Sequence, residues 1–155
     1  MGFNIAGIIV NKKISDTDIE TLLKLKIKFL KEVDFEDATS SFKDENTVDI
    51  LQTETGTLLI TELGQMYDLD DSLHDSIQFM VSDISDTYYF EKFLKGQLVR
   101  KFITTQGETA EDVGEGHISE EDDLMEKVWE YIDTYLQNDF TNTMQDQTFK
   151  RYELE

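Results

Sequence analysis

Hydrophobic and polar residues follow two different patterns along this chain, and each pattern predicts a different element. Residues 3–11 (FNIAGIIVN) form an almost continuous apolar run, which predicts a buried strand. Residues 23–29 instead alternate strictly between apolar and polar, which is the period of a half-exposed strand. That alternation would place Lys24, Lys26 and Lys28 together on one face.

A short helix is predicted between these two runs. Ser15 has the character of an N-cap, and Asp18 stands three residues later, in the first turn. We expect this helix to continue to about residue 25 and to be followed by a strand through Val33 and Phe35. A single longer helix is the competing interpretation of the same residues.

Two hairpins are predicted in the middle of the chain. Residues 47–62 contain two β-rich runs around Glu54-Thr55-Gly56, where Gly56 could adopt a positive φ. Residues 88–105 form a similar pair around Lys95-Gly96. Between them, residues 66–75 read as an acidic loop or a brief helix, and residues 77–82 (IQFMVS) as another apolar strand.

The clearest helix is predicted near the C-terminus. Ser119 is the expected N-cap, and the acids 120–123 would fill the first turn, where they oppose the positive end of the helix dipole. We expect the helix to end near Gln137–Asn138. Its apolar face recurs at helical spacing at Leu124, Val128, Ile132 and Tyr135, widened by Met125, Trp129 and Leu136.

The remaining segments complete the predicted fold. Residues 106–117 read as a Gly-rich acidic loop, and the tail 147–154 could add a last strand to the sheet. The chain has 155 residues, the size of one ordinary domain, so we expect a single α+β domain over residues 1–155. It would contain a mostly antiparallel sheet of about six to eight strands, a short N-terminal helix and one long C-terminal helix.

Charge changes the functional picture more than any motif does. The chain has 34 acids against 14 lysines and arginines, a formal net charge of -20. Residues 1–31 oppose this trend, with six lysines and three acids. A strongly negative field repels nucleic acid and anionic membranes and attracts cationic surfaces, so we expect a basic protein partner.

Candidate catalytic and metal sites are weak. The acids from Asp68 resemble the start of a calcium loop, but Leu73 and Phe79 occupy the positions that require Gly and Glu. His117 lies among acids, yet the chain has only two histidines, and a catalytic zinc usually uses three protein ligands. No cysteine, nucleophile elbow or phosphate loop is present. We therefore expect no catalytic residues, no metal site and no cofactor.

Candidate partner-binding residues come from three segments: an acidic segment at 67–75, an aromatic strand at 88–93 and an acidic loop at 108–123. Alternation sends Tyr88 and Phe90 to one face of the strand and Tyr89 to the other. For the aromatic residues, packing within the sheet is favoured over partner binding. For the acids, the alternative to partner binding is a solvated surface. The candidates are Asp68, Asp70, Asp71, Tyr88, Tyr89, Glu111, Asp112, Glu115 and Glu120.

The order of several short segments resembles that of small acidic bacterial proteins of the immunity type, which are encoded beside toxins. The segments are Thr55–Leu59, Gly96–Arg100, Val113–Gly116 with Glu120 or Glu121, and Arg151-Tyr152. The resemblance implies a compact α+β domain without catalytic residues. It supplies no binding residues, so none are transferred. From the residues themselves, an ion pair between the Gly-Glu-Gly loop and Arg100 is the expected structural role of that loop.

The sequence thus favours a non-catalytic, immunity-type inhibitor that neutralises a cognate bacterial toxin through a negatively charged surface. A nucleic-acid mimic that inhibits a DNA-binding protein is one alternative, and a small metal-dependent enzyme is another. The N-terminus lacks a basic region before its short apolar run, so we expect a cytoplasmic protein with no membrane contact. We expect a monomer or a weak homodimer, because like charges oppose self-association.

Overall fold

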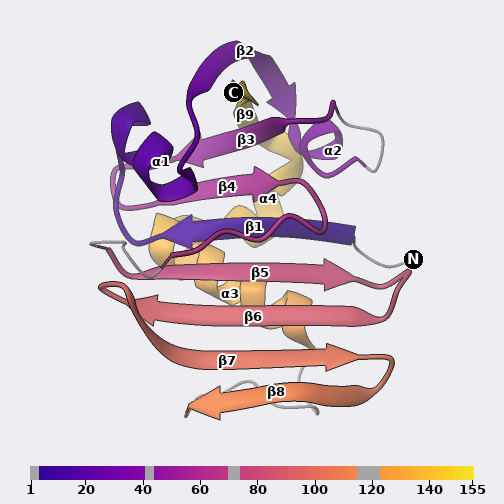
Figure 1. Cartoon of the computed structure of the whole chain (residues 1–155). Coiled ribbons are helices and arrows are strands. Elements are labelled where there is room, and N and C mark those ends of the chain that lie inside the picture. The colour runs from indigo at the N-terminus through magenta and orange to yellow at the C-terminus, as the bar shows by residue number, and fades with distance from the viewer. Residues whose placement is uncertain (1–3, 41–43, 70–73, 115–122) are drawn as a thin grey trace.

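In the computed structural model of the chain, the described residues form one sheet of nine antiparallel strands (Figure 1). The structure describes residues 4–40, 44–69, 74–114 and 123–155. The elements in chain order are β1 (Asn4–Val10), α1 (Asp16–Leu23), β2 (Ile27–Asp34), α2 (Phe35–Ala38), β3 (Thr47–Gln52), β4 (Thr57–Thr61), β5 (Ser76–Ser82), β6 (Thr87–Leu94), β7 (Gln97–Thr105), β8 (Glu108–Gly114), α3 (Leu124–Leu136), α4 (Phe140–Thr143), a 3₁₀ turn (Met144–Asp146) and β9 (Thr148–Leu154).

The strand order across the sheet is β2-β9-β3-β4-β1-β5-β6-β7-β8. The predicted strand in the C-terminal tail is present, but β9 lies inside the sheet between β2 and β3. On one side Phe149 is opposite Val33 of β2, and on the other Arg151 is opposite Asp49 of β3. The last residues of the chain therefore join β2 to the rest of the sheet.

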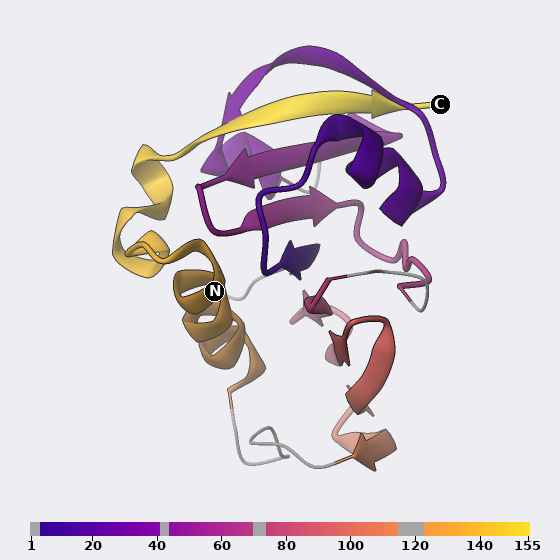
Figure 2. The same ribbon diagram turned by 90° about the vertical axis from the view of Figure 1, so that its left-hand side faces the viewer.

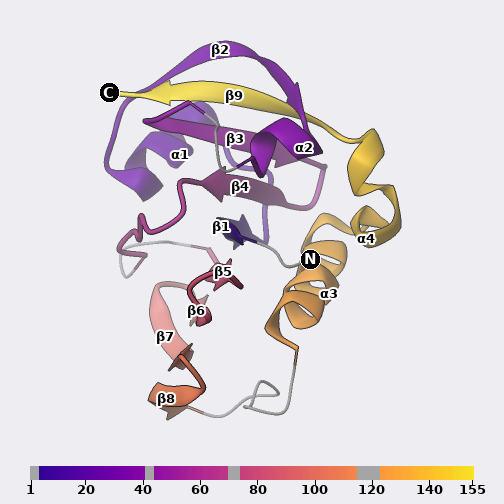
Figure 3. The same cartoon turned by 90° about the vertical axis from the view of Figure 1, so that its right-hand side faces the viewer.

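The central strands β3, β4, β1 and β5 are buried on both faces. Ile9 and Ile77 are paired across β1 and β5 and point toward α3, whereas Ile8 points to the opposite face. Figures 2 and 3 show α3 on one side of the sheet and α1 on the other. This two-sided cover explains why residues 3–11 form a continuous apolar run instead of an alternating one.

The first helix ends before β2, so the interpretation with a short helix is confirmed and the single longer helix is wrong. Ser15 and Asp18 form a reciprocal capping box, and Lys24 ends the helix in the left-handed conformation with φ 59°. The predicted three-lysine face is also wrong, because of the three lysines only Lys28 lies within β2. Phe35 does not extend the strand, since Asp34 caps α2 at that point.

The C-terminal helix has the predicted apolar face and end. Leu124, Val128, Ile132 and Tyr135 are all buried, and Gln137 ends the helix with φ 52°. Its N-cap is Asp123, whose carboxylate accepts a hydrogen bond from the Glu126 amide, so the helix begins later than predicted. The expected cap Ser119 lies outside the described residues.

The predicted sheet of six to eight strands is too small, chiefly because the stretch 106–117, a predicted loop, contains β8. Gln106 and Gly107 both have positive φ and form a tight turn, and β8 then pairs with β7 through Gly114. The predicted turn at Lys95-Gly96 is confirmed, again with two positive φ angles. The short helices α2 and α4 were not predicted. Among the described helices, none is long and apolar enough to cross a membrane.

The β3–β4 hairpin is present, but Gly56 is required for a different reason from the one expected. It does not adopt a positive φ; instead a Cβ at this position would lie 2.4 Å from the carbonyl oxygen of Tyr135. The hydroxyls of Thr53 and Thr55 donate hydrogen bonds to the carbonyls of Leu136 and Tyr135 at 2.8 and 3.1 Å. The hairpin therefore satisfies carbonyl groups at the end of α3.

Candidate protein-binding surface

The strands β5 to β8 share a face that points away from α3. Met80, Tyr89, Ile103 and Glu111 are cross-strand partners in one row across these four strands. A second row beside it contains Gln78, Glu91, Lys101 and Val113. We call these eight residues the open face. Burial decreases across it, from the buried Gln78 to the half-exposed Val113, because α1 lies beside the central strands and not over β6–β8 (Figures 2 and 3).

A continuous hydrogen-bond network fixes the inner side of the open face. The buried Gln78 amide accepts from the Tyr67 backbone N–H and donates to the Tyr67 carbonyl, both at 2.8 Å. The same amide donates to Glu91 Oε1 at 3.2 Å, and the Tyr89 hydroxyl donates to that oxygen at 2.6 Å. The network therefore holds the segment 66–69 against β5 and fixes the Tyr89 ring on the face.

The outer side of the open face carries charge of both signs. Lys101 Nζ lies 3.6 Å from Glu111 Oε2 and 5.7 Å from the centre of the Tyr89 ring. Burial of the phenol, together with its hydrogen bond to Glu91, raises the pKa of Tyr89 well above its ordinary value. Tyr89 thus stays a neutral hydrogen-bond donor at any physiological pH.

The other candidates from strands β6 and β8 point to the opposite face. Tyr88 packs against the core beneath α3, as its alternation with Tyr89 predicted. Asp112 forms an ion pair with the buried Arg100, which also donates to the Val113 carbonyl at 2.9 Å. Asp112 is therefore one partner of Arg100 within β8; the Glu115 carboxylate, which was expected to pair with Arg100, lies outside the described residues. Sequence reasoning therefore grouped residues that the sheet separates.

The acidic segment before β5 contributes one described candidate, Asp68. Its carboxylate lies 3.5 Å from Lys24 Nζ, and both side chains are more than half exposed. Asp68 adjoins Tyr67, so the Gln78 network places it at the edge of the open face. The remaining predicted partner-binding residues, Asp70, Asp71, Glu115 and Glu120, lie outside the described part of the chain.

Acids distant in sequence form ion pairs with three of the six lysines of the basic N-terminal stretch. Lys13 pairs with Glu54, Lys24 with Asp68, and Lys31 with Asp44, at distances of 3.5 to 4.0 Å. These pairs offset part of the local excess of lysine that the sequence shows. These exposed pairs are individually weak, and their main consequence is the distribution of charge.

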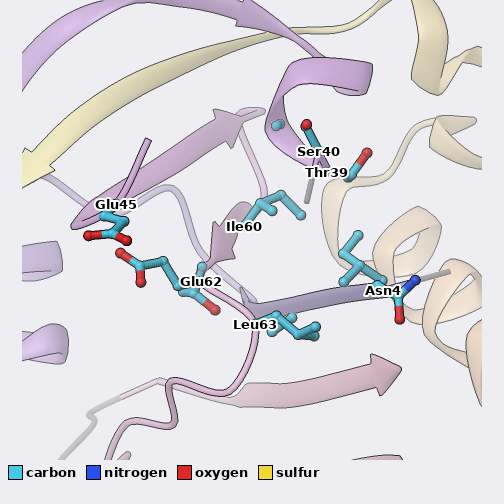
Figure 4. Close-up of a pocket in the computed structure, with 11 residues that line it drawn as sticks. Asn4, Thr39, Ser40, Glu45, Ile60, Glu62 and Leu63 are labelled. Carbon is cyan, nitrogen blue, oxygen red and sulfur yellow. The ribbon is translucent and has the colours of Figure 1, made fainter. Parts of the chain in front are cut away.

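A pocket of about 220 Å³ lies between α2 and the ends of β1 and β4. Figure 4 shows Glu45 and Glu62 near each other at one side of it, with Asn4 at the other. Glu62 accepts a hydrogen bond from the Asn46 backbone. The volume is below the usual range for small-molecule sites. In the part of the chain that the structure describes, no group of three His or acidic residues could hold a metal ion.

Sequence reasoning missed Gln78 and Glu91, the two residues that organise the open face. Their signal was the presence of a polar residue within an apolar strand. Gln78 interrupts the run 76–82, and Glu91 follows three aromatic residues. A buried polar side chain normally has a hydrogen-bond partner, so each interruption indicates a specific contact. The contact itself depends on the strand register, which the sequence did not provide.

No protein-family model matches the chain, and neither the curated proteins nor the solved structures include a significant match. The function must therefore be inferred from the arrangement of the chain's own residues.

Proposed function

We propose that this chain is a non-catalytic binding protein of the immunity type, which neutralises a basic toxin by covering part of its surface. The observation that carries the proposal is the open face of β5–β8, where a fixed aromatic side chain lies among apolar and charged residues. A sheet face that none of the described helices covers is a natural place for another protein to pack.

The chemistry of the open face suits a protein partner. Tyrosine is enriched at the energetic centres of interfaces, and a side chain already fixed by hydrogen bonds loses little entropy on binding. Tyr89 has this character because Glu91 holds its hydroxyl. Met80, Ile103 and Val113 add apolar area around it. The net charge of -20 would accelerate the encounter with a basic protein.

The first test is affinity capture from a lysate of the source organism at low salt, with bound proteins identified by mass spectrometry. We expect one basic protein at near-equal stoichiometry, released by added salt. If that protein is toxic when expressed alone, co-expression of this chain should restore growth. Failure to restore growth would leave a binding protein that is not an inhibitor.

Variants of the open face then test the site. Tyr89→Ala should weaken binding of the captured protein about tenfold or more. Glu111→Lys should slow association and reduce its dependence on salt. The matched control is Glu32→Lys, which makes the same charge reversal on β2 at the opposite edge of the sheet. Equal effects of the two reversals would mean that only total charge matters and would contradict the open face as the site.

The same capture experiment decides between the alternatives. A DNA-binding protein, released by competing DNA, would favour a nucleic-acid mimic. Retention of no protein would contradict the binding proposal and favour the small enzyme. In that case a stabilising shift in melting temperature on addition of zinc or manganese would identify the metal-dependent form.

A further inference from the structure

The turn between β5 and β6 presents an apolar side chain directly to solvent. Ile84 is 85% exposed, the highest value among the large hydrophobic residues that the structure describes, and the next is Phe29 at 51%. Single exposed hydrophobic residues are common on protein surfaces. Ile84 differs because several side-chain hydrogen bonds hold the turn that carries it.

Asn4, at the start of β1, anchors the first half of the turn. Its Oδ1 accepts from the Ser82 hydroxyl at 3.1 Å and from the Ile84 backbone N–H at 3.3 Å. The Ser85 hydroxyl donates to Ser82 Oγ at 2.7 Å. The backbone at Ile84 is therefore fixed by a strand distant in sequence, and the side chain projects from a rigid base.

The neighbouring strand and turn hold the two aspartates of this segment. The Tyr88 hydroxyl donates to Asp83 Oδ1 at 2.6 Å, and the Gln106 N–H donates to the Asp86 carbonyl at 2.7 Å. The second contact joins the β5–β6 turn to the β7–β8 turn at the same end of the sheet (Figure 1). Tyr88, a predicted partner-binding residue, thus has a bracing role behind the turn.

Asp83 and Asp86 flank the exposed isoleucine in the turn. The hydrogen bond from the Tyr88 hydroxyl to Asp83 raises the pKa of Tyr88 to about 12. Burial and the charges of Asp83, Asp86 and Asp123 add to the effect. A rigid apolar side chain between carboxylates combines the two elements of a tight interface. Burial supplies affinity, and the charges supply steering and register.

We propose that Ile84 is an anchor residue that inserts into an apolar pocket on the basic partner, and that lysine or arginine at the rim of this pocket meets Asp83 and Asp86. This inference rests on the proposed function and names a specific contact for it. Because the turn is already ordered, little conformational entropy is lost when it docks. The interface would therefore extend from the open face to this end of the sheet.

Ile84→Ala tests the anchor. The probe is the basic protein captured on the wild-type chain, purified, and titrated by calorimetry. We expect the Kd to rise about tenfold or more, because most of the apolar area that the Ile84 side chain buries in the partner's pocket would be lost. The melting temperature should not change, since the side chain is exposed. Leu94→Ala is the matched control, at the other end of β6 and 43% exposed, and its Kd should stay within about twofold of the wild type.

Asp86→Asn tests the charged rim while keeping the backbone. Asp86 has φ 50°, and asparagine tolerates this left-handed conformation. We expect slower association and a smaller salt dependence. Lysozyme, a basic protein other than the captured partner, serves as a second probe for charge alone; its weak binding should respond to Asp86→Asn but not to Ile84→Ala.

The outcomes separate this inference from the proposed function. If no basic protein is captured, the proposed function is wrong and the anchor is wrong with it. If a basic protein binds and responds to Glu111→Lys, but its Kd is unchanged by Ile84→Ala, only the anchor is overturned. A tenfold or larger loss with Ile84→Ala, and none with Leu94→Ala, would support both.

Discussion

The central strands and the β6–β8 strands use the same antiparallel pairing in different surroundings. In β3, β4, β1 and β5 nearly every residue is buried, because helices or the segment 66–69 cover both faces. In β6 and β7 burial is intermittent, and in β8 every residue is exposed. The comparison suggests that the central strands provide stability, whereas the outer strands present side chains to a partner.

Each region contains an ion pair between an arginine and an aspartate. Arg151 and Asp49, in the covered region, are 4% and 0% exposed, and the guanidinium donates two hydrogen bonds of 2.8 and 3.0 Å to the carboxylate. This hydrogen bond raises the pKa of Arg151 further above its ordinary value. Arg100 is equally buried, but its partner Asp112 is 55% exposed. Water therefore competes for one pair and not for the other.

Removal of one partner from each pair gives the largest predicted contrast. Asp49→Ala should reduce the free energy of unfolding by about 3–5 kcal/mol, because it leaves a buried guanidinium without its main acceptor. Asp112→Ala should cost less, about 1–2 kcal/mol, because Arg100 keeps its hydrogen bonds to the carbonyls of Lys101 and Val113. Urea denaturation of both variants measures the difference. Equal losses would show that the outer strands are as closed to water as the centre.

Packing at the centre gives the next contrast. A Cβ at Gly7 of β1 would lie 2.6 Å from the Leu59 carbonyl oxygen and 2.8 Å from the Phe79 ring. Gly7→Ala should therefore destabilise the protein by about 1–3 kcal/mol through overpacking. Gly107→Ala, in the β7–β8 turn, meets open space, so only its positive φ of 78° opposes alanine, at about 1 kcal/mol.

Thermal unfolding of the two glycine variants checks this order. A larger loss for Gly107 than for Gly7 would mean that the outer turn contributes more to stability than the central packing does. It would also contradict the division between the two regions.

The sequence predicted elements that depend on local chemistry. The Ser15–Asp18 capping box, the Lys95-Gly96 turn and the apolar face of α3 are all formed by residues within a few positions of one another. Strand 3–11 was also predictable, because cover on both faces produces a continuous apolar run.

Features that depend on distant partners were not predictable. β8 lacks an apolar pattern, and it forms because β7 offers an unpaired edge after a tight turn. The place of β9 inside the sheet depends on simultaneous pairing with two strands. At the candidate site, alternation correctly separated Tyr88 from Tyr89. Only the register, however, shows that Glu111 shares a row with Tyr89.

A smaller effect is expected from the hydroxyl of Tyr89. Tyr89→Phe keeps the ring but removes the hydrogen bond to Glu91, which retains its contact with Gln78. We expect a loss of roughly 1 kcal/mol in the free energy of unfolding. Partner binding should weaken less than with Tyr89→Ala, because the ring area remains. Denaturation and calorimetry on the same samples separate the two effects, and equal binding losses for both variants would mean that the hydroxyl contacts the partner directly.

The smallest effect concerns the exposed end of the outer strands at alkaline pH. The hydrogen bond to Asp83 raises the pKa of Tyr88 from 10.0 to about 12 in the folded protein. Because the folded pKa is the higher one, this contribution to stability is complete below about pH 10 and is lost as the pH rises toward 12. Between these values the unfolded chain releases the proton first.

Urea midpoints measured from pH 9 to 11.5 should therefore fall less steeply for Tyr88→Phe than for the wild type. Parallel slopes would show that the Asp83 contact is too open to water to stabilise the turn, and the rigid base assigned to Ile84 would then depend on its other hydrogen bonds, among them those of Asn4, Ser82 and Gln106.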